Sequence, residues 1–324
     1  MAEQTTSTPV DAYQTGKAVR LAARNKTFTG QTSGLAPSYL QANLLVLPKR
    51  YAADFRLLCA RNPVPCPLLA ESATPGDATA LVSHVAAPRN SGVKAAAAAA
   101  ATTTLPVAAD IDLRHDFPAY TVYRDGVLTA QRQTDIAAEW TADHVGFLVG
   151  CSYSFEAALA AAGLTPRHVA QGRNVPMYRT TVPLMAAGVF SGATMVVSMR
   201  PYRAGAEVER VRDVTRAFAS SHGEPVAWGW DGAAALGVAD VARPEFGDAP
   251  LSGDGSGRAF GPGEGLGDEG GGGGGEFVPV FWGCGVTPQE AVRQAGLQGT
   301  VMAHAPGHMV VLDLTDREVF PGLA

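Results

Sequence analysis

Residues 145–163 constrain the fold most, because they read as a buried strand, a tight turn and a short helix in immediate succession. The apolar residues 145–149 predict a strand that ends at Gly150. The sequence CSYS follows as a turn, and the Ala-rich residues 155–162 predict a helix that ends at Gly163. Such a unit exposes backbone N–H groups at the start of its helix, where an anion can bind.

The turn carries several side chains that could take part in chemistry. Ser152 or Ser154 is expected to cap the helix, and Glu156 lies in the first turn, where the helix dipole favours a negative charge. Tyr153 and Ser154 could donate hydrogen bonds to a developing oxyanion. Cys151 could be a nucleophile, because a helix start lowers the pKa of a thiol, or simply a small buried apolar residue. The turn is therefore a candidate site for a small acid.

A second strand–turn–helix unit, residues 277–297, repeats the pattern of the first. Cys284 follows a strand-ending glycine as Cys151 does, and in both units a glycine lies 12 residues after the cysteine. Thr287 and Glu290 are spaced as a helix-capping box. The repeat reflects either internal duplication or coincidence. The chain is predicted to be an α/β protein, with mixed sheets in two lobes and flanking helices.

The 324 residues are enough for one large or two medium domains. We expect a main α/β domain from residues 17–110 and 205–324, and a second, smaller α/β domain from residues 111–204. The Ala- and Thr-rich residues 95–104 are expected to form a surface loop or a short helix. The Gly-rich residues 252–275 are expected to form a flexible loop.

The composition limits the classes of function. The net charge of −5 argues against binding to nucleic acid or to an anionic membrane as the main task. No apolar run is long enough for a membrane-spanning helix, and no secretory signal is visible. Four scattered cysteines suit a reducing compartment. We expect a cytoplasmic protein, with the mitochondrial matrix as the alternative, and the sequence leaves self-association open.

Three arginines are candidates for binding a carboxylate substrate. Arg173 and Arg179 lie in a loop after the turn, and Arg200 ends an apolar run. A guanidinium group binds a carboxylate through two parallel hydrogen bonds, although most arginines only form surface or structural ion pairs. Gln41 and Asn43 lie in an apolar segment. Their amides either orient a ligand or form hydrogen bonds within the core.

Two histidines are candidates for proton transfer, because an imidazole titrates near neutral pH. His304 and His308 lie in the sequence HAPGHM, which we expect to pack against the CSYS turn. Histidines satisfied by hydrogen bonds in the core are the alternative. Asp313 could complete a metal site with them, but the residue pattern favours no metal and no cofactor.

Several blocks of the sequence resemble one known family. They include GLAPSYLQANL (34–44), GCSYSFEAAL (150–159), GRNVPMYRT (172–180) and HAPGHM (304–309). Together with RNPVPCPLL, YTVYRDG, VVSMRP and VFWGCGVTPQEAV, they are similar to the hydro-lyase family that includes D-glutamate cyclase. The two low-complexity inserts depart from that family's pattern and fall between the blocks.

The resemblance implies a carbon–oxygen lyase of amino acid metabolism that eliminates water from a small carboxylic acid. D-glutamate closing to 5-oxo-D-proline is the reaction that it favours. The residues alone leave a second hypothesis open, a binding protein for a small amino or hydroxy acid without catalysis. The assignment of site residues rests on their chemistry and not on the family.

Overall fold

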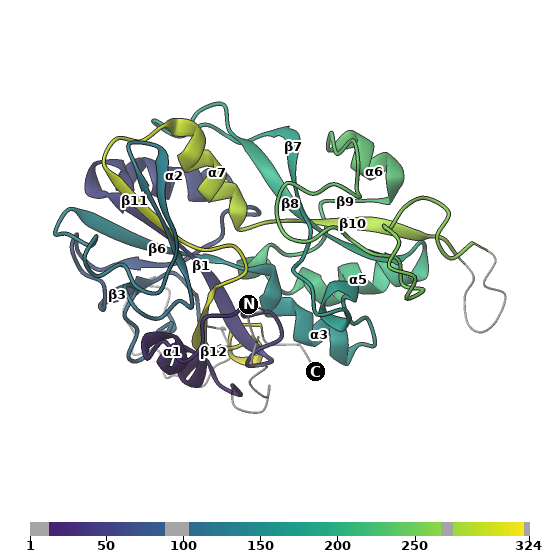
Figure 1. The fold of residues 1–324 in the computed structure, drawn as a ribbon, viewed down its shortest axis with the longest axis horizontal. Coiled ribbons are helices and arrows are strands. Elements are labelled where there is room, and N and C mark those ends of the chain that lie inside the picture. Colours follow the sequence, from purple (N-terminus) through teal and green to yellow (C-terminus); the bar gives the residue numbers. More distant parts are fainter. Residues whose placement is uncertain (1–12, 88–103, 267–274, 321–324) are drawn as a thin grey trace, which may run out of the picture.

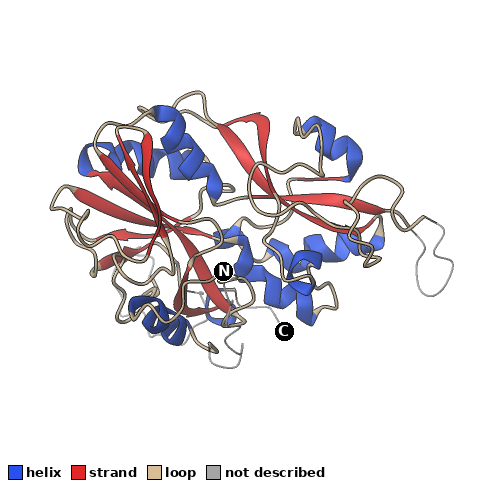
Figure 2. Cartoon of the chain, viewed as in Figure 1, coloured by secondary structure: helices blue, strands red, loops and turns tan. Residues whose placement is uncertain are grey.

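The structure is a computed structural model that describes residues 13–87, 104–266 and 275–320. In these residues the strands form two sheets, one of eight strands and one of four. Figure 1 shows the larger sheet on the left and the smaller one on the right. Helices lie against both sheets (Figure 2). Within the described ranges, the structure contains no candidate membrane-spanning helix.

The larger sheet is organised around its long strand β1. Its strands are β1 (Tyr39–Pro48), β2 (Leu68–Ser72), β3 (Leu81–Ser83), β4 (Tyr120–Arg124), β5 (Val127–Gln133), β6 (His144–Gly150), β11 (Thr300–His304) and β12 (Val310–Thr315). One edge of β1 pairs with β6. The other edge pairs with β12 near Gln41 and with β11 near Leu45. Both faces of β1 are buried, since Leu44 and Leu45 contribute to two different apolar clusters.

The smaller sheet has the order β7-β8-β10-β9. Its strands are β7 (Met177–Pro183), β8 (Thr194–Arg203), β9 (Ala227–Trp228) and β10 (Phe277–Gly283). Val280 and Trp282 face the cluster that also contains Leu44, so one core joins the two sheets. Phe281 points to the opposite face, as expected for the alternation of side chains along a strand.

Helices cover the faces of both sheets. They are α1 (Gly16–Arg24), α2 (Ala52–Arg61), α3 (Glu156–Ala161), α4 (Arg167–Ala170), α5 (Ala206–Arg216), α6 (Gly229–Ala235), α7 (Val286–Ala295) and α8 (Asp316–Val319), with short 3-10 helices η2 (Lys49–Tyr51), η3 (Ser152–Phe155) and η4 (Ala219–Ser221). Helix α1 packs on β12, where the buried Arg20 pairs with Asp313 at 2.8 Å. Asp313 is therefore occupied by an ion pair.

The α/β class and the two lobes are confirmed. The pairs of neighbouring strands in both sheets are antiparallel, whereas the sequence predicts mixed sheets. The sheets also group the strands differently from the predicted domains. Strands β4, β5 and β6 fall within residues 111–204 but belong to the larger sheet, and β9 and β10 fall within 205–324 but belong to the smaller one. The domain boundaries and the internal duplication stay predictions.

The two low-complexity inserts are described only in part. Residues 88–103 and 267–274 lie outside the described residues, so that most of the Ala- and Thr-rich segment, but only part of the Gly-rich one, is not described. Within 252–266 the chain makes specific contacts, which a freely flexible loop would not. Phe260 is buried and stacks on Trp230 with ring centroids 5.5 Å apart, and Glu264 pairs with Arg167 at 2.8 Å.

The structure confirms one local sequence signal, the Asp125-Gly126 hairpin turn, and contradicts another, the Thr287 capping box. Asp125 and Gly126 both have positive φ, 51° and 78°, and they join β4 to β5 as the predicted hairpin turn. The predicted capping box at Thr287 is wrong, because its hydroxyl exchanges hydrogen bonds with the backbone of Val196 in β8 and α7 begins at Val286. A partner from another strand has displaced the local one.

Candidate active site

The chain passes from the larger sheet to the smaller one through the CSYS turn. Strand β6 ends at Gly150, and η3 and α3 follow directly. A Cβ atom at Gly150 would lie 1.9 Å from the carbonyl oxygen of Ser220, so that only glycine fits. Ser152 and Ser154 do not cap α3, because their hydroxyls bond to other elements. The turn therefore points its side chains into the protein.

A buried ion pair anchors the start of α3. Arg200 of β8 is fully buried, and its Nη2 and Nε both donate to Oε1 of Glu156, Nε at 3.2 Å. The other bonds of its guanidinium group go to the hydroxyls of Ser152 and Ser198, both at 3.1 Å. The ring of Phe155 lies below the guanidinium carbon at 5.0 Å. Arg200 thus holds Glu156 in place, and it has no pair of parallel N–H groups left to bind a ligand carboxylate.

The carboxyl group of Glu156 is ionised. Burial by itself would raise its pKa, but the charges of His168 and Arg200 outweigh burial and lower the pKa. Nε2 of His168 lies 3.1 Å from Oε1. The second oxygen, Oε2, is buried and has no hydrogen-bond partner among the described residues. A buried acceptor of this kind is costly unless a donor reaches it.

Gln41 provides a second acceptor next to the turn. Its backbone N–H donates to the hydroxyl of Ser154 at 3.0 Å, and its Nε2 donates to the carbonyl of Thr32 at 3.0 Å. Its Oε1 is buried without a partner in the described part of the chain. Asn43 differs, because its Nδ2 donates to the carbonyl of Gly150 at 2.8 Å and so fixes the end of β6.

A cavity of about 190 Å³ lies beside these groups. Gln41, Tyr153 and Glu156 line it, together with the loop of residues 34–39, with Ala157 and Ala160 of α3, and with Thr165, Pro166 and Val169. A volume of roughly 10–15 Å³ per water-sized atom leaves room for a dozen or more non-hydrogen atoms. In the loop, Ala36 and Ser38 have positive φ of 43° and 70°. Strained backbone of this kind gathers at ligand sites.

The HAPGHM turn packs against the CSYS turn, as the sequence predicts. Met309 belongs to one apolar cluster with Cys151 and Tyr153. The backbone N–H of Thr32 donates to the carbonyl of Gly307 at 2.9 Å, and Thr32 in turn accepts from Gln41. The HAPGHM turn, the CSYS turn and residues 32–41 therefore meet next to the cavity.

Neither histidine of that turn lines the cavity. Nδ1 of His304 accepts the backbone N–H of Leu44 at 3.1 Å, and burial lowers the pKa of His304 to about 4. Nδ1 of His308 lies 2.8 Å from the carbonyl oxygen of Pro306, and burial lowers the pKa of His308 as well. Both imidazoles are neutral at pH 7, and the expectation of a near-neutral pKa is wrong for His304. Among the described residues, no group of three histidine, cysteine or acidic side chains could hold a metal ion.

The cysteines are also buried. Cys151 and Cys284 belong to the same apolar cluster. Burial raises the pKa of the Cys151 thiol, and it raises that of Cys284 to about 11. The expected lowering of the thiol pKa by the helix start is therefore wrong, because desolvation disfavours the thiolate more strongly.

The remaining two arginines lie outside the cavity. Nη2 of Arg173 donates to the carbonyl of Ala249 at 3.2 Å. Nε of Arg179 donates to Glu290 at 2.8 Å, and 40 % of its side chain is exposed. Their roles as carboxylate ligands stay predictions.

Two partners of cavity-lining residues, Asn174 and His168, were not among the predicted site residues. Tyr153 donates its hydroxyl hydrogen to Oδ1 of Asn174, which follows Arg173 in the loop, and His168 flanks Glu156. The block GRNVPMYRT pointed to the segment of Asn174 but not to the residue. Nothing in the local sequence singles out His168, because its partner lies on a different helix.

Fold and site together define a two-lobed α/β protein with a small cavity beside the turn that joins its lobes. The chain belongs to the D-glutamate cyclase family, whose model matches residues 145–313. A protein of Jannaschia named "Putative hydro-lyase" is 41% identical over 94% of this chain and 95% of its own length. Two more with this name, from Schizosaccharomyces pombe and Paraburkholderia phymatum, are 42% and 44% identical, over 97% and 93% of this chain and 86% and 96% of theirs.

Proposed function

We propose that this protein is a hydro-lyase that closes D-glutamate to 5-oxo-D-proline and water in the cavity beside the CSYS turn. One observation carries the proposal. Gln41 and Glu156 line the same cavity, and each keeps a buried acceptor oxygen without a donor in the described residues. An ammonium group supplies three donors and a positive charge, which match a neutral acceptor and a carboxylate.

The rest of the substrate fits the cavity in size. Glutamate has fewer non-hydrogen atoms than the dozen or more for which there is room. Ser38 and Thr165 line the same cavity, and their hydroxyls would donate to carboxylate oxygens. The relatives' name supports a reaction that eliminates water, and the family model supports D-glutamate as the substrate.

The reaction forms one bond and breaks one. The amine nitrogen attacks the distal carboxyl carbon, a C–N bond forms, and one C–O bond of that carboxyl group breaks. The nitrogen loses two protons, and both end on the oxygen that leaves as water. Glu156 would accept protons from the nitrogen and pass them on, while Arg200 holds its other oxygen in place. Gln41 would orient the nitrogen toward the carboxyl carbon.

The test is turnover of D- and L-glutamate followed by NMR. We expect 5-oxoproline from the D-enantiomer with the wild type, and a loss of roughly 100-fold or more in kcat with Glu156→Gln. Glu209→Gln, at an exposed position of α5, is the matched control and should keep wild-type activity.

A second variant covers the case in which Glu156→Gln does not fold. Gln41→Met keeps the size of the side chain but removes the amide, and it should raise KM for D-glutamate. Binding of D-glutamate without any 5-oxoproline would contradict the proposal and leave the chain as a binding protein.

A further inference from the structure

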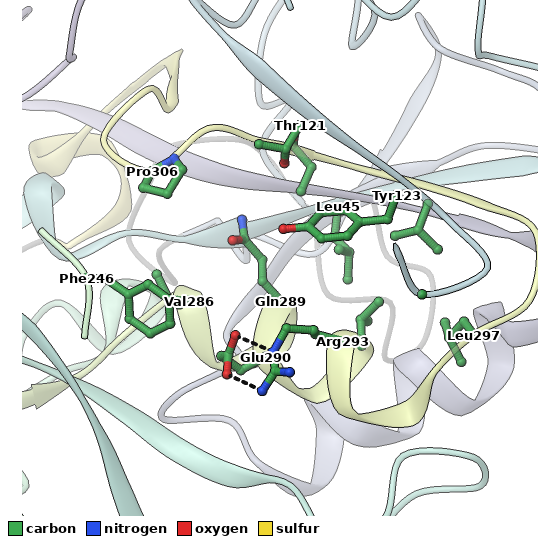
Figure 3. Close-up of a pocket in the computed structure, with 14 residues that line it drawn as sticks. Leu45, Thr121, Tyr123, Phe246, Val286, Gln289, Glu290, Arg293, Leu297 and Pro306 are labelled. Atoms are coloured by element: carbon green, nitrogen blue, oxygen red, sulfur yellow. Dashed lines mark hydrogen bonds and ion pairs between the residues drawn. The ribbon is translucent and has the colours of Figure 1, made fainter. Parts of the chain in front are cut away.

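A second cavity, of about 80 Å³, lies between the larger sheet and α7. Figure 3 shows Thr121 and Tyr123 of β4 on one side of it, and Gln289, Glu290 and Arg293 of α7 on the other. None of these residues lines the cavity beside the CSYS turn. The proposed function uses no group of this second cavity, so that its presence calls for a separate explanation.

Most of the wall is apolar. The side chains that form it come from β1, β11, α7 and the loops around them: Leu45, Phe246, Val286, Val292, Leu297, Val301, Ala303 and Pro306. At roughly 10–15 Å³ per water-sized atom, the space holds a body of about five to eight non-hydrogen atoms. A ligand that fills it gains from burying apolar surface, and this favours a compact hydrocarbon body.

Arg293 lines one end of the cavity, and Arg179, which does not line the cavity, lies beside that end on the same carboxylate. Arg293 binds both oxygens of Glu290, at 3.0 and 3.1 Å, and Arg179 binds the same carboxylate at 2.8 Å. Two cations therefore share a single carboxylate and keep nitrogens that Glu290 does not occupy. Glu245, which is exposed to solvent, accepts the backbone N–H of Arg179 at 3.1 Å.

The aromatic side chains define the geometry of this end. The guanidinium carbon of Arg179 lies 4.7 Å from the ring centre of Phe246, which closes the cavity on the side of Pro306 (Figure 3). Tyr123 is half-buried, and its pKa is raised by burial and by the charge of Glu290. Its phenol is therefore protonated and can donate a hydrogen bond.

We propose that the cavity between β4 and α7 binds a small monocarboxylate with an apolar body. The body would lie against Leu45, Leu297 and Ala303, and the carboxylate would face Arg293 and the hydroxyl of Tyr123. The site is separate from the proposed reaction, and its occupant would contact both the larger sheet and α7. Binding would consequently stabilise the packing of α7 on that sheet.

Calorimetric titration of the full chain with 3-methylbutanoate tests the proposal. We expect saturable binding of the acid and none of 3-methylbutan-1-ol or 3-methylbutylamine, which keep the apolar body without the negative charge. Arg293→Gln should weaken binding about tenfold, since a hydrogen bond between two charged groups is lost at a partly exposed position. Arg216→Gln, an exposed arginine of α5, is the matched control and should leave the affinity unchanged.

Two further variants make the outcome specific to this cavity. Ala303→Val adds bulk to its wall and should reduce the affinity, whereas Gln41→Met, in the other cavity, should leave it unchanged. The proposal is overturned if the acid does not bind, if the alcohol binds equally well, or if Arg293→Gln and Ala303→Val bind as the wild type does. Loss of binding in Gln41→Met alone would place the acid in the other cavity and also overturn it.

Discussion

The decisive residue of the account is Glu156, and its state depends on its neighbours more than on its own position in α3. Its pKa is lowered because the charges of His168 and Arg200 outweigh the effect of burial. The sequence identifies Glu156 as an acid in the first turn of a helix. It does not identify Arg200 as its partner, because 44 residues separate the two. The sequence likewise identifies Tyr153 and Gln41 as site candidates. It does not show that Tyr153 donates to Asn174, or that Oε1 of Gln41 has no donor in the described residues.

Removing the charge of Arg200 should destabilise the protein strongly. Arg200→Met leaves the carboxylate of Glu156 buried with less compensation, and a broken buried pair costs about 3–5 kcal/mol. Urea unfolding measures the loss in the free energy of unfolding. Arg212→Met, at partly exposed pairs with Glu209 and Glu224, should cost much less, because solvent screens such pairs. Equal losses in the two variants would show that the buried pair is not what holds Glu156.

At the scale of elements, the sequence predicts best those features that depend on residues close together in the chain. The hairpin at Asp125-Gly126 and the two strand–turn–helix units follow from turn chemistry and from runs of apolar residues. The predicted caps failed, because hydroxyls that could cap a helix bond instead to strands distant in sequence, as Thr287 does with Val196. The burial of His304 has the same cause, since β11, which ends at His304, lies between β1 and β4.

At the turn that ends β6, we predict that replacing Gly150 by alanine lowers both stability and activity. Gly150→Ala places a Cβ atom 1.9 Å from the carbonyl oxygen of Ser220, and the forced shift should cost about 1–3 kcal/mol or more. The shift would also move the CSYS turn and lower activity. Thermal unfolding and turnover measure the two effects. Gly261→Ala, where nothing lies within 4 Å of the added atom, should behave as the wild type, and similar behaviour of Gly150→Ala would contradict the packing described for this turn.

At the scale of the molecule, a shared core joins the two sheets, and the cavity lies beside the turn between them. The sequence predicts the α/β class and two lobes, but not the pairing of β6 with β1 and β2 or of β4 with β11. Such pairings depend on contacts between distant residues, which a pattern of neighbours does not encode. Expectations on self-association, on compartment and on the absence of nucleic-acid and membrane partners stay predictions.

Stability should fall as the pH is lowered from 6.5 toward 4. His222 and His304 have a pKa of about 4 in the folded chain because of burial, below the usual value of 6.5. The unfolded chain therefore binds more protons in this window, and the stabilisation present above pH 6.5 is lost as the pH falls. Each histidine should cost on the order of 2 kcal/mol between pH 7.5 and pH 5.

Urea unfolding at pH 7.5, 6 and 5 measures this loss. The carboxyl groups with lowered pKa, such as Glu156 and Glu290, protonate below this range and contribute little to it. A free energy of unfolding that is constant from pH 7.5 to 5 would show that the two histidines are not buried in the neutral form.

The central claim is that Glu156 and Gln41 bind the substrate's ammonium group, and a crystal structure with D-norvaline tests it most directly. This amino acid keeps the ammonium group and the α-carboxylate but lacks the distal carboxyl group, so that it cannot cyclise. We predict its nitrogen at about 2.7–3.2 Å from both Oε2 of Glu156 and Oε1 of Gln41. A nitrogen bound elsewhere, or a ligand found only in the cavity between β4 and α7, would contradict the account.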